Sequence, residues 1–374
     1  MSIDIELNEE IARGASRFLA ARMPIKPTGP FPSSEELKSV WTELLGLGWP
    51  YVLATDHGSS AGASQVEAIF RSIGRHPIIG PTIDMFIGLP LTWRAAEEVA
   101  QQLLEPYMMG EKLLAMARLT ETPDQRVSPD VWAGCRFSAD RISGFKTLVD
   151  NVELCDALLV HGLDGDEPVL LLVDAAAAGV RVEKLSTPDL SRRFAMVHFE
   201  QAAATVLVRG TQALQVEQAI ERFGRLATVA ELCGLAETGL AMAVDYAKLR
   251  KQFGRTIGSF QAIKHLLAEG KMLEYGLSCV STRLAEEMEE AVDGDGGALA
   301  ATRALCYASR SAQSVFDIAL QVHGGIGFTL EYGLSWYYNR AAGLWGLWGD
   351  PNSLALQLGR RQCGCEPENG ATAG

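Results

Sequence analysis

The stretch QVHGGIG, residues 321–327, places three glycines among seven residues. Such a density of glycine lets a backbone come close to the phosphate groups of a cofactor. A dinucleotide-binding loop of this kind follows a β-strand and opens a helix. Here, the preceding run is Ala-rich, with apolar residues at helical intervals. The stretch alone therefore leaves two interpretations open, the C-cap of a helix or a cofactor-binding turn between helices.

The charge of the chain excludes several classes of partner. The 374 residues carry a formal net charge of −13. Such a surface repels nucleic acid and anionic membranes, so we expect neither as a partner. The most apolar run, Leu226–Val244, contains Glu231 and Glu237, which argues against a membrane span.

The cysteine spacing and the N-terminus predict the compartment. Seven cysteines are scattered along the chain, and the closest pair is Cys363 and Cys365. Structural zinc sites use duplicated pairs with two residues between the cysteines, so we predict no metal site. The acidic N-terminus lacks the apolar core of a signal peptide, and we therefore predict reduced thiols in a cytoplasmic protein.

The first two segments differ in their hydrophobic periodicity. Residues 1–110 show helical spacing, and Ser33 and Glu36 stand at the spacing of a capping box. Residues 111–210 hold short β-rich runs such as FAMVHFE, separated by Gly, Asp and Pro. We predict an N-terminal helical domain, followed by a small antiparallel β-barrel or sandwich.

The C-terminal segment, residues 211–362, returns to helical spacing. Its helices of roughly 30 to 40 residues exceed the common globular length and need a broad partner surface. This predicts an antiparallel four-helix bundle and, for the whole chain, an α+β fold. Residues 363–374 have the composition of a disordered tail.

Two C-terminal motifs carry a family resemblance. They are YAKLRKQFGRTIGSFQAIKHLLAE at 246–269 and QVHGGIGFTLEY at 321–332. With the order of helical, β-rich and long helical segments, they resemble the acyl-CoA dehydrogenase family over nearly the whole chain. The resemblance is strongest to actinobacterial members that act on steroid side chains or unusual acyl chains. It implies FAD-dependent α,β-dehydrogenation of an acyl-CoA thioester, in which a carboxylate takes the α-proton and flavin takes a hydride.

The resemblance also assigns residues that bind FAD. The family's R-x-x-F-G arginine binds the FAD diphosphate from across a dimer and corresponds to Arg250, whose guanidinium offers a fork of donors to phosphate. Phe253 matches an aromatic residue near the flavin, and Gln261 matches a polar contact. The adenosine-side turn and the flavin-side segment match at Gln321, Gly324, Gly325, Leu119 and Thr120. With the resemblance, the cofactor-binding interpretation of QVHGGIG is favoured.

The catalytic base is missing at both positions where the family places it. Arg340 aligns with the arginine before the usual Glu, and Gly349 then stands at the position of that Glu. Other members carry the base on the first long C-terminal helix, where this chain has Gly224. Two nearby carboxylates remain candidate bases, namely Asp350, one residue late, and Glu221, three residues early.

The β-rich segment departs from the family as well. DQRV, residues 124–127, replaces the usual Gly-Ser, and Leu148 and Asp150 replace the Trp and Thr that flank the flavin. We expect weaker stacking on the isoalloxazine and poorer hydrogen bonding to its N5. The losses fall on one half of a flavin site, while the half between Arg250 and Gly325 is retained.

Three hypotheses remain. In the first, the chain is a subunit of a heteromeric acyl-CoA dehydrogenase, as in the family's α2β2 members, and its partner carries the base. In the second, it is a self-sufficient homo-oligomer that uses Glu221 or Asp350. In the third, it is a non-redox acyl-CoA-binding or assembly protein on the same fold. The implied partners are acyl-CoA, a second dehydrogenase subunit and an acceptor such as electron-transfer flavoprotein, and the acyl chain stays open.

Overall fold

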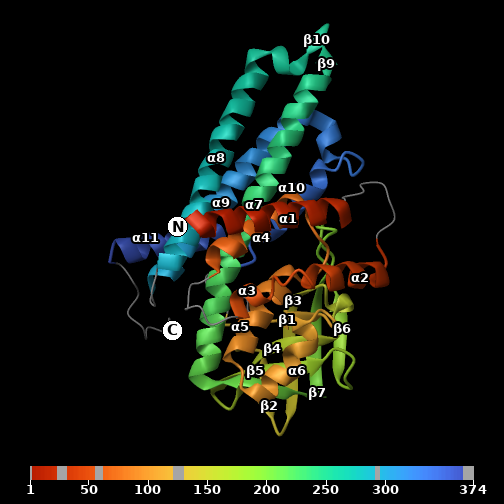
Figure 1. Ribbon diagram of the computed structural model, residues 1–374, viewed down its shortest axis with the longest axis vertical. Coiled ribbons are helices and arrows are strands. Elements are labelled where there is room, and N and C mark those ends of the chain that lie inside the picture. The colour runs from red at the N-terminus through yellow and green to blue at the C-terminus, as the bar shows by residue number, and fades with distance from the viewer. Residues whose placement is uncertain (1, 23–31, 55–61, 121–129, 291–294, 365–374) are drawn as a thin grey trace, which may run out of the picture.

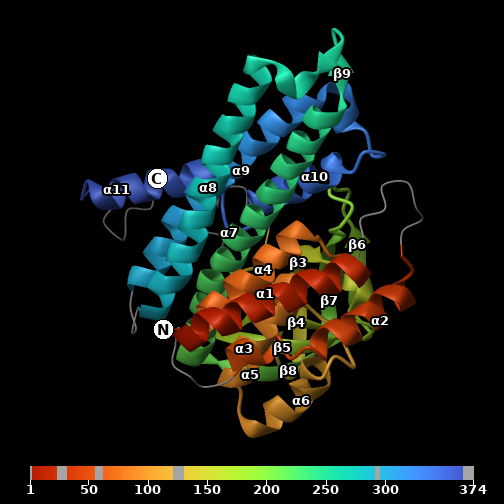
Figure 2. The same cartoon turned by 45° about the horizontal axis from the view of Figure 1, so that its top comes forward.

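The computed structural model describes residues 2–22, 32–54, 62–120, 130–290 and 295–364 (Figure 1). The β-rich part lies at one end of the long axis, and long helices rise from it to the other end. The N-terminal helices lie against both parts, with α1 across α4 (Figure 2). This arrangement is the predicted α+β fold, with a helical segment before and after the sheet.

The N-terminal helices begin and end at local signals. Ser33 caps α2, because its Oγ accepts a hydrogen bond from Glu36 N and its own N–H donates to Glu36 Oε2. Both bonds of the predicted capping box are therefore confirmed. The elements are α1 Ser2–Arg22, α2 Ser34–Leu45, α3 Tyr51–Ala54, α4 Ala63–Arg75, the π-helical η1 Asp84–Gly88, α5 Leu89–Ala95 and α6 Glu98–Met108.

The strands form one eight-stranded sheet in the order β6-β7-β3-β2-β4-β5-β8, with β1 on β4. Most neighbouring strands pair antiparallel, as predicted, but the sheet is mixed, because β1 and β2 each pair with β4 in parallel. Parallel neighbours need a crossover connection, and here other strands intervene in sequence. The strands are β1 Leu114–Ala117, β2 Cys135–Ser138, β3 Arg141–Asp150, β4 Ala157–Asp164, β5 Glu167–Asp174, β6 Val180–Lys184, β7 Phe194–Ala203 and β8 Thr205–Arg209.

The C-terminal segment is built on three long helices of 40, 30 and 29 residues. The predicted bundle has a shorter fourth member than expected, because α10 has only 11 residues. The N-terminal α4 packs along α7 and also contacts α8. The elements are α7 Gly210–Leu249, β9 Lys251–Gln252, β10 Arg255–Thr256, α8 Gln261–Glu290, α9 Asp295–His323, η4 Gly324–Phe328, α10 Leu334–Leu344 and α11 Pro351–Gln362; η2 Val152–Leu154 and η3 Ile257–Ser259 are short connectors.

Helices α4 and α7 cross at a pair of glycines. A Cβ on Gly74 would collide with the backbone of Glu231, and one on Gly234 would collide with the backbone of Arg71. Only glycine on both helices allows this close approach. The crossing therefore fixes the N-terminal helices against the bundle.

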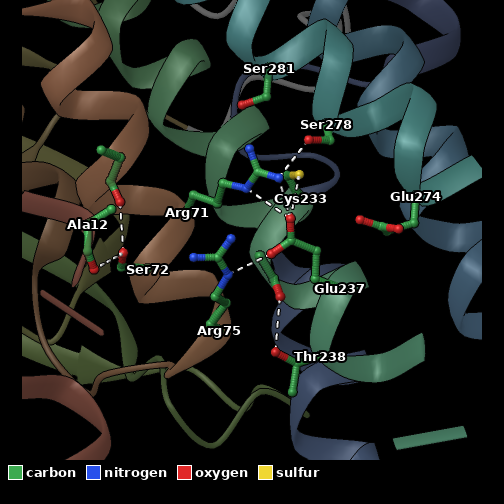
Figure 3. Close-up of polar contacts among 12 residues, drawn as sticks. Ala12, Arg71, Ser72, Arg75, Cys233, Glu237, Thr238, Glu274, Ser278 and Ser281 are labelled. Atoms are coloured by element: carbon green, nitrogen blue, oxygen red, sulfur yellow. Dashed lines mark hydrogen bonds and ion pairs between the residues drawn. The ribbon is translucent and has the colours of Figure 1, made fainter. Parts of the chain in front are cut away.

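A polar cluster reinforces this crossing and reaches α8 (Figure 3). Arg75 Nε donates to Glu237 Oε2 at 2.6 Å, and Arg71 also pairs with Glu237. Arg71 Nη2 further donates to Ser278 Oγ at 2.6 Å. Burial works to lower the pKa of Arg71, but Cys233 and Glu237 raise it, so the guanidinium stays charged. The Glu237 carboxylate thus joins α7 to α4, and Arg71 extends the cluster to α8.

Helix α7 is, among the described residues, the one helix long and apolar enough by composition to cross a membrane. However, 72% of its most apolar window is buried inside the fold. Both acids of the apolar run Leu226–Val244 are paired with arginines. Glu231 Oε1 lies 2.6 Å from Nε of the buried Arg340, and Glu237 pairs with Arg71 and Arg75 of α4. These contacts are those of a core helix.

Candidate functional site

A cleft of about 650 Å3 lies between the β-rich part and the C-terminal helices. One wall holds Leu119, Thr120, Thr147 and Leu148, from the end of β1 and from β3. The opposite wall includes Gly349 and Asp350, in the turn between α10 and α11. The cleft therefore brings together the predicted flavin-side segment and the position of the missing base.

Lys146 supports the β-side wall from beneath. Its side chain is fully buried, and its ammonium donates to the carbonyls of Val131 at 2.6 Å and Ala133 at 2.7 Å. It also reaches Thr120 Oγ1 and the Arg118 carbonyl, each at 3.2 Å. Burial lowers the pKa of Lys146 to about 8. This one ammonium ties together the segments that form the wall.

Leu148 enters the cleft because β3 is irregular at this point. The pairing of β3 with β7 shifts register between Lys146 and Val149. Leu148 takes a φ of +52°, and its side chain is 45% exposed. An aliphatic side chain thus occupies the place where the resemblance puts Trp. The replaced Gly-Ser, residues 124–127, lies outside the described residues.

The turn on the opposite wall is unsuited to a catalytic Glu. Gly349 has a backbone φ of +110°, a conformation that residues other than glycine rarely adopt. The next residue, Asp350, is the N-cap of α11. Its Oδ2 accepts hydrogen bonds from Ser353 N at 2.8 Å and Ser353 Oγ at 2.9 Å. Asp350 lines the cleft, but its carboxylate also holds the start of a helix.

Glu221 is also engaged elsewhere. Its carboxylate pairs with Arg225, one turn further along α7. Arg225 in turn donates to Thr302 Oγ1 on α9 at 2.7 Å. In the described part of the chain, Glu221 lines neither the cleft nor a second, smaller cavity of about 50 Å3 next to it, which is described below as the lobe. The geometry therefore brings Asp350, but not Glu221, to the cleft.

The Trp348 ring fills the space beside Gly224, one of the two family base positions. It directly precedes Gly349, and a Cβ added to Gly224 would clash with its ring. The indole Nε1 donates to Thr228 Oγ1 at 2.8 Å, and the ring is 5% exposed. The guanidinium carbon of Arg118 lies 4.8 Å from the ring centroid, within cation–π range. The indole is therefore held on several sides.

Arg118 is itself fixed by a buried cluster. Its Nε donates to Glu217 Oε1 at 2.7 Å, and His161 Nε2 lies 2.7 Å from Glu217 Oε2. Burial works to raise the pKa of Glu217, but the Arg118 and His161 charges lower it to about 2. Glu217 therefore stays ionised and paired, which makes it a poor proton acceptor at neutral pH.

A smaller lobe of about 50 Å3 lies behind Leu119, Leu148 and Leu347 and is partly polar. Asp84, from the π-helical turn, and Arg192 line it. Within the described structure, Asp84 Oδ2 and two guanidinium nitrogens of Arg192 have no hydrogen-bond partner.

Asp150 also faces this lobe rather than the cleft. It lies 3.7 Å from Arg192 Nη1 and accepts a hydrogen bond from Asn151. Burial raises the pKa of both Asp84 and Asp150. Asp150 thus faces Arg192 in the lobe rather than the cleft, although the resemblance places it where the family has a Thr that flanks the flavin.

The other predicted cofactor residues lie on and near the β9–β10 hairpin, at the end of the long axis away from the sheet (Figure 1). The side chain of Arg250 is exposed and makes no polar contact with the described residues, and Phe253 is 93% exposed on the β9–β10 hairpin. The rings of Tyr246 and His323 stack at 4.6 Å and join the ends of α7 and α9. The remaining predicted residues are Gln261 at the start of α8, Gln321 near the end of α9, and Gly324 and Gly325 in η4, which follows α9. One chain therefore presents two separate groups of predicted cofactor residues.

Comparison with known proteins identifies the family. A family profile described as acyl-CoA dehydrogenase, C-terminal domain, matches residues 214–362. Acyl-CoA dehydrogenase FadE27 of Mycobacterium tuberculosis is 30% identical over 316 residues, which cover 80% of this chain and 82% of that protein. This chain belongs to the acyl-CoA dehydrogenase family. The actinobacterial character expected from the motifs is confirmed as well.

Two further similarities bear on the acyl-CoA dehydrogenase assignment. Acyl-CoA dehydrogenase FadE34 of M. tuberculosis is 37% identical over 182 residues, but the match spans 48% of this chain and 24% of FadE34. The ChsE4–ChsE5 complex of M. tuberculosis has the same fold, with a TM-score of 0.77, 22% identity and coverage of 96% of this chain and 98% of that chain. The cofactor of the family is FAD, as predicted.

The residues present form two groups, each of which suits a different part of an FAD molecule. The exposed guanidinium of Arg250 suits a diphosphate, because Arg offers several donors to phosphate oxygens. Gly324, with a φ of +65° and open space around it, leaves room for a ligand to approach the backbone. The distant cleft offers a separate volume that is flanked by the flavin-side residues Leu119 and Thr120.

Sequence reasoning missed Trp348 and Lys146. The Trp348 signal was present, since an aromatic residue precedes the glycine at the expected base position. Its contact with Gly224 joins residues far apart in sequence, so the spacing of residues does not reveal it. Lys146 had no comparable signal, because its partners are mostly backbone carbonyls of other segments.

Proposed function

We propose that this chain is the FAD-binding, base-deficient subunit of a heteromeric acyl-CoA dehydrogenase that forms an α,β double bond in an acyl-CoA thioester. The observation that carries the proposal is the pair of glycines at the two family base positions. Gly349 has a backbone conformation unsuited to Glu, and Gly224 is packed against an indole. The working carboxylate is therefore assigned to a partner subunit.

In this proposal, the chain contributes to a flavin shared with its partner. The contributing residues are those near the β9–β10 hairpin, Arg250, Phe253, Gln261, Gln321, Gly324 and Gly325, which we call the far-end group. Arg250 binds the diphosphate, and the Gly324 turn lies beside the adenosine. Bound FAD supplies a hydride acceptor for the reaction. The chain itself orients the cofactor, and its bundle surface docks the partner.

Exposed apolar residues support a partner at that end of the bundle. Leu249 is 78% exposed, Phe253 93% and Phe328 67%. Large exposed apolar residues close together on a protein surface commonly mark an interaction site. The ChsE4–ChsE5 structure, whose title names two different chains in a complex, is consistent with a heteromeric partner.

The second candidate is a self-sufficient enzyme that uses Asp350, because this carboxylate lines the cleft. Against it, Asp350 holds the first turn of α11, and a base must lie within about 3 Å of the proton it takes. Glu221 is weaker still as a base, since it pairs with Arg225 outside the cleft.

The decisive experiment compares the isolated chain with the chain co-expressed and co-purified with an acyl-CoA dehydrogenase subunit that carries the catalytic Glu. Flavin bleaching by an acyl-CoA is followed in a single turnover. We expect bleaching only in the pair, and Glu221→Gln and Asp350→Asn should leave it largely intact. If either substitution abolishes bleaching while FAD stays bound, the base belongs to this chain. Protein that binds no flavin in either form would instead favour the non-redox alternative.

The proposal also covers the electron acceptor and the cellular location. We propose a protein acceptor such as electron-transfer flavoprotein for the reduced flavin, and re-oxidation of a bleached sample by that protein tests it. The proposed cytoplasmic location agrees with the free thiols of Cys135, Cys155, Cys233, Cys279 and Cys306.

A further inference from the structure

Buried acidic and basic side chains from several elements meet at the lobe of about 50 Å3. Asp84 of η1, Asp150 at the end of β3 and Arg192, which precedes β7, line this lobe. Glu231 Oε1 of α7 lies 2.6 Å from Arg340 Nε of α10, and both side chains are fully buried. The charges of this pair act on Asp150. We call the whole group the lobe cluster, and its members are Asp84, Asp150, Asp189, Arg192, Glu231 and Arg340.

The charges of the lobe cluster do not balance. The cluster holds four carboxyl groups and two guanidinium groups. Every member except Asp150 is at most 7% exposed, and the Asp150 side chain is 13% exposed. Burying a charge without a counter-ion is so unfavourable that a carboxyl group takes up a proton instead. The cluster therefore favours a neutral form for at least one of its acids.

Three of the four acids have partners that favour the ionised form. The acid of α7 is paired with Arg340, as described above. Asp150 Oδ2 lies 3.7 Å from Arg192 Nη1. Asp189 Oδ1 accepts hydrogen bonds from Ser191 N at 2.9 Å and from Ser191 Oγ at 2.6 Å. The fourth acid, on η1, is different.

Asp84 has no basic partner within ion-pair distance among the described residues, and its Oδ2 reaches neither solvent nor a hydrogen-bond partner there. Burial and the nearby charge of Asp150 raise the pKa of Asp84 well above its ordinary value. A hydrogen bond with the Met116 backbone and the charge of Arg192 oppose this rise with smaller effects. Asp84 is therefore the acid of the cluster that is best placed to hold a proton.

Other titratable groups near the lobe do not compensate Asp84. Arg118 lines the lobe, but its guanidinium is paired with Glu217. The thiol of Cys155 interacts with Asp84 and Asp150, and burial raises the pKa of this thiol well above its ordinary value. It therefore stays neutral and adds no charge.

We propose that Asp84 is a protonated acid at neutral pH and serves as a pH-sensitive latch, whose neutral form lets the lobe cluster join η1, the sheet and the bundle. Loss of the proton at higher pH loosens this junction. The β-side wall of the cleft lies next to it, because Leu148 is two residues before Asp150 on β3. The latch goes beyond the proposed function and is independent of it, since it needs neither flavin nor a partner.

A raised pKa makes the folded chain less stable as pH rises. An acid of this kind binds more protons in the folded chain than in the unfolded chain. The contribution of Asp84 to stability is therefore complete below its ordinary pKa of 3.8 and is lost as pH rises through the folded value. An uncharged side chain of the same shape should escape this loss.

The first test compares melting temperatures at pH 4.5 and pH 8. Asp84→Asn keeps the shape of the side chain but cannot ionise. Its Tm relative to the wild type should rise by at least about 2 °C from the lower to the higher pH. The control Asp317→Asn, exposed on α9, should shift Tm by less than about 1 °C at both values. A Tm difference for Asp84→Asn that is constant or shrinks with pH would overturn the proposal.

A second variant separates Asp84 from an ion-paired acid of the same cluster. Glu231→Gln leaves the buried Arg340 without its counter-ion and should lower Tm at pH 8. Asp84→Asn should have the opposite sign there. If Asp84→Asn lowers Tm at pH 8 as Glu231→Gln does, Asp84 is an ionised, paired carboxylate and the proposal fails.

Infrared spectroscopy observes the proton directly. The difference spectrum of the folded chain at pH 7, wild type minus Asp84→Asn, should contain the carbonyl band of a protonated carboxyl group. A spectrum that contains carboxylate bands alone would overturn the proposal, whatever the stability of the variant.

Hydrogen exchange shows where the latch acts. At pH 8, peptides from η1 and from the end of β3 should exchange faster in the wild type than in Asp84→Asn. Both proteins are compared at the same pH, so the intrinsic exchange rates are equal. A peptide from the middle of α8 serves as the control and should exchange alike in both. A difference spread evenly over all peptides would reject a local latch.

Discussion

Arg118 and Glu217 form a buried ion pair that joins the end of β1 to α7, with Arg118 Nε 2.7 Å from Glu217 Oε1. The pair lies between the β-rich part and the bundle, and Arg118 extends from it to the Trp348 ring. Arg118, held by Glu217, therefore links the end of β1 to the indole. His161, the third member, adds a contact to the same carboxylate from β4.

Glu217→Gln should destabilise the chain by about 3 to 5 kcal/mol, because it leaves the buried Arg118 charge without its counter-ion. Urea unfolding at pH 7 measures this. The control Asp245→Asn breaks an exposed pair with Lys248 and should change stability by at most about 1 kcal/mol. Equal effects of the two substitutions would show that the buried pair does not form.

The same carboxylate predicts an acid dependence. The pKa of Glu217 in the folded chain is about 2, below its ordinary value of 4.5. Its stabilising contribution is therefore full above pH 4.5 and is lost as pH falls towards 2. The wild-type minus Glu217→Gln difference in unfolding free energy should shrink over this window. A difference that stays constant down to pH 3 would contradict the assignment.

The elements with local signals were predictable from sequence. Ser33 and Glu36 specify the start of α2 through contacts three residues apart. The long helices of the bundle were predictable because their apolar spacing extends over many turns. In β7, Ala195, Val197 and Phe199 are all buried, as alternation requires.

The site was harder to predict because its contacts join distant segments. Trp348 meets Thr228 across 120 residues, and no periodicity links them. The parallel pairing of β1 with β4 likewise depends on tertiary contacts rather than on any local pattern. What the sequence did show is which side chains are absent, since glycine at 224 and 349 is visible without any structure.

Lys146→Met should weaken the β-side wall. The substitution removes the donor shared by four oxygens, and leaving buried acceptors such as the Val131 and Arg118 carbonyls unsatisfied costs about 1 to 3 kcal/mol. The pKa of Lys146 is lowered from 10.5 to about 8, so the unfolded chain binds more protons between these values. The Lys146 contribution to stability should therefore rise from pH 8 to 10.5.

The pH range used stays below the pKa of neighbouring Cys135, which burial raises to about 11, so the comparison of Lys146→Met with the wild type follows mainly Lys146. The readout is unfolding free energy in urea at pH 7.5 and pH 10. A wild-type minus variant difference that is flat or falls across this range would refute the buried ammonium.

Arg250→Ala should lower FAD content about tenfold or more at limiting cofactor. The substitution removes a charge-assisted contact worth roughly 1.5 to 3 kcal/mol. Flavin absorbance per protein measures it, in the chain and in its assembly. Arg283→Ala, another exposed arginine, on α8, serves as the control and should keep its flavin. Unchanged occupancy in Arg250→Ala would remove the far-end group from the cofactor site.

Phe328→Asp should disrupt the subunit interface. Phe328 is 67% exposed at the end of the bundle that also carries Leu249 and Phe253, and burying a charge in an apolar interface is strongly unfavourable. Light scattering should show dimers or larger assemblies for the wild type at micromolar concentration and dissociation for Phe328→Asp. Val99→Asp, which changes a similarly exposed residue on α6, should leave the assembly intact. If the wild type is a stable monomer both alone and with its proposed partner, the far-end residues have no second subunit to serve, and the shared-flavin proposal fails with them.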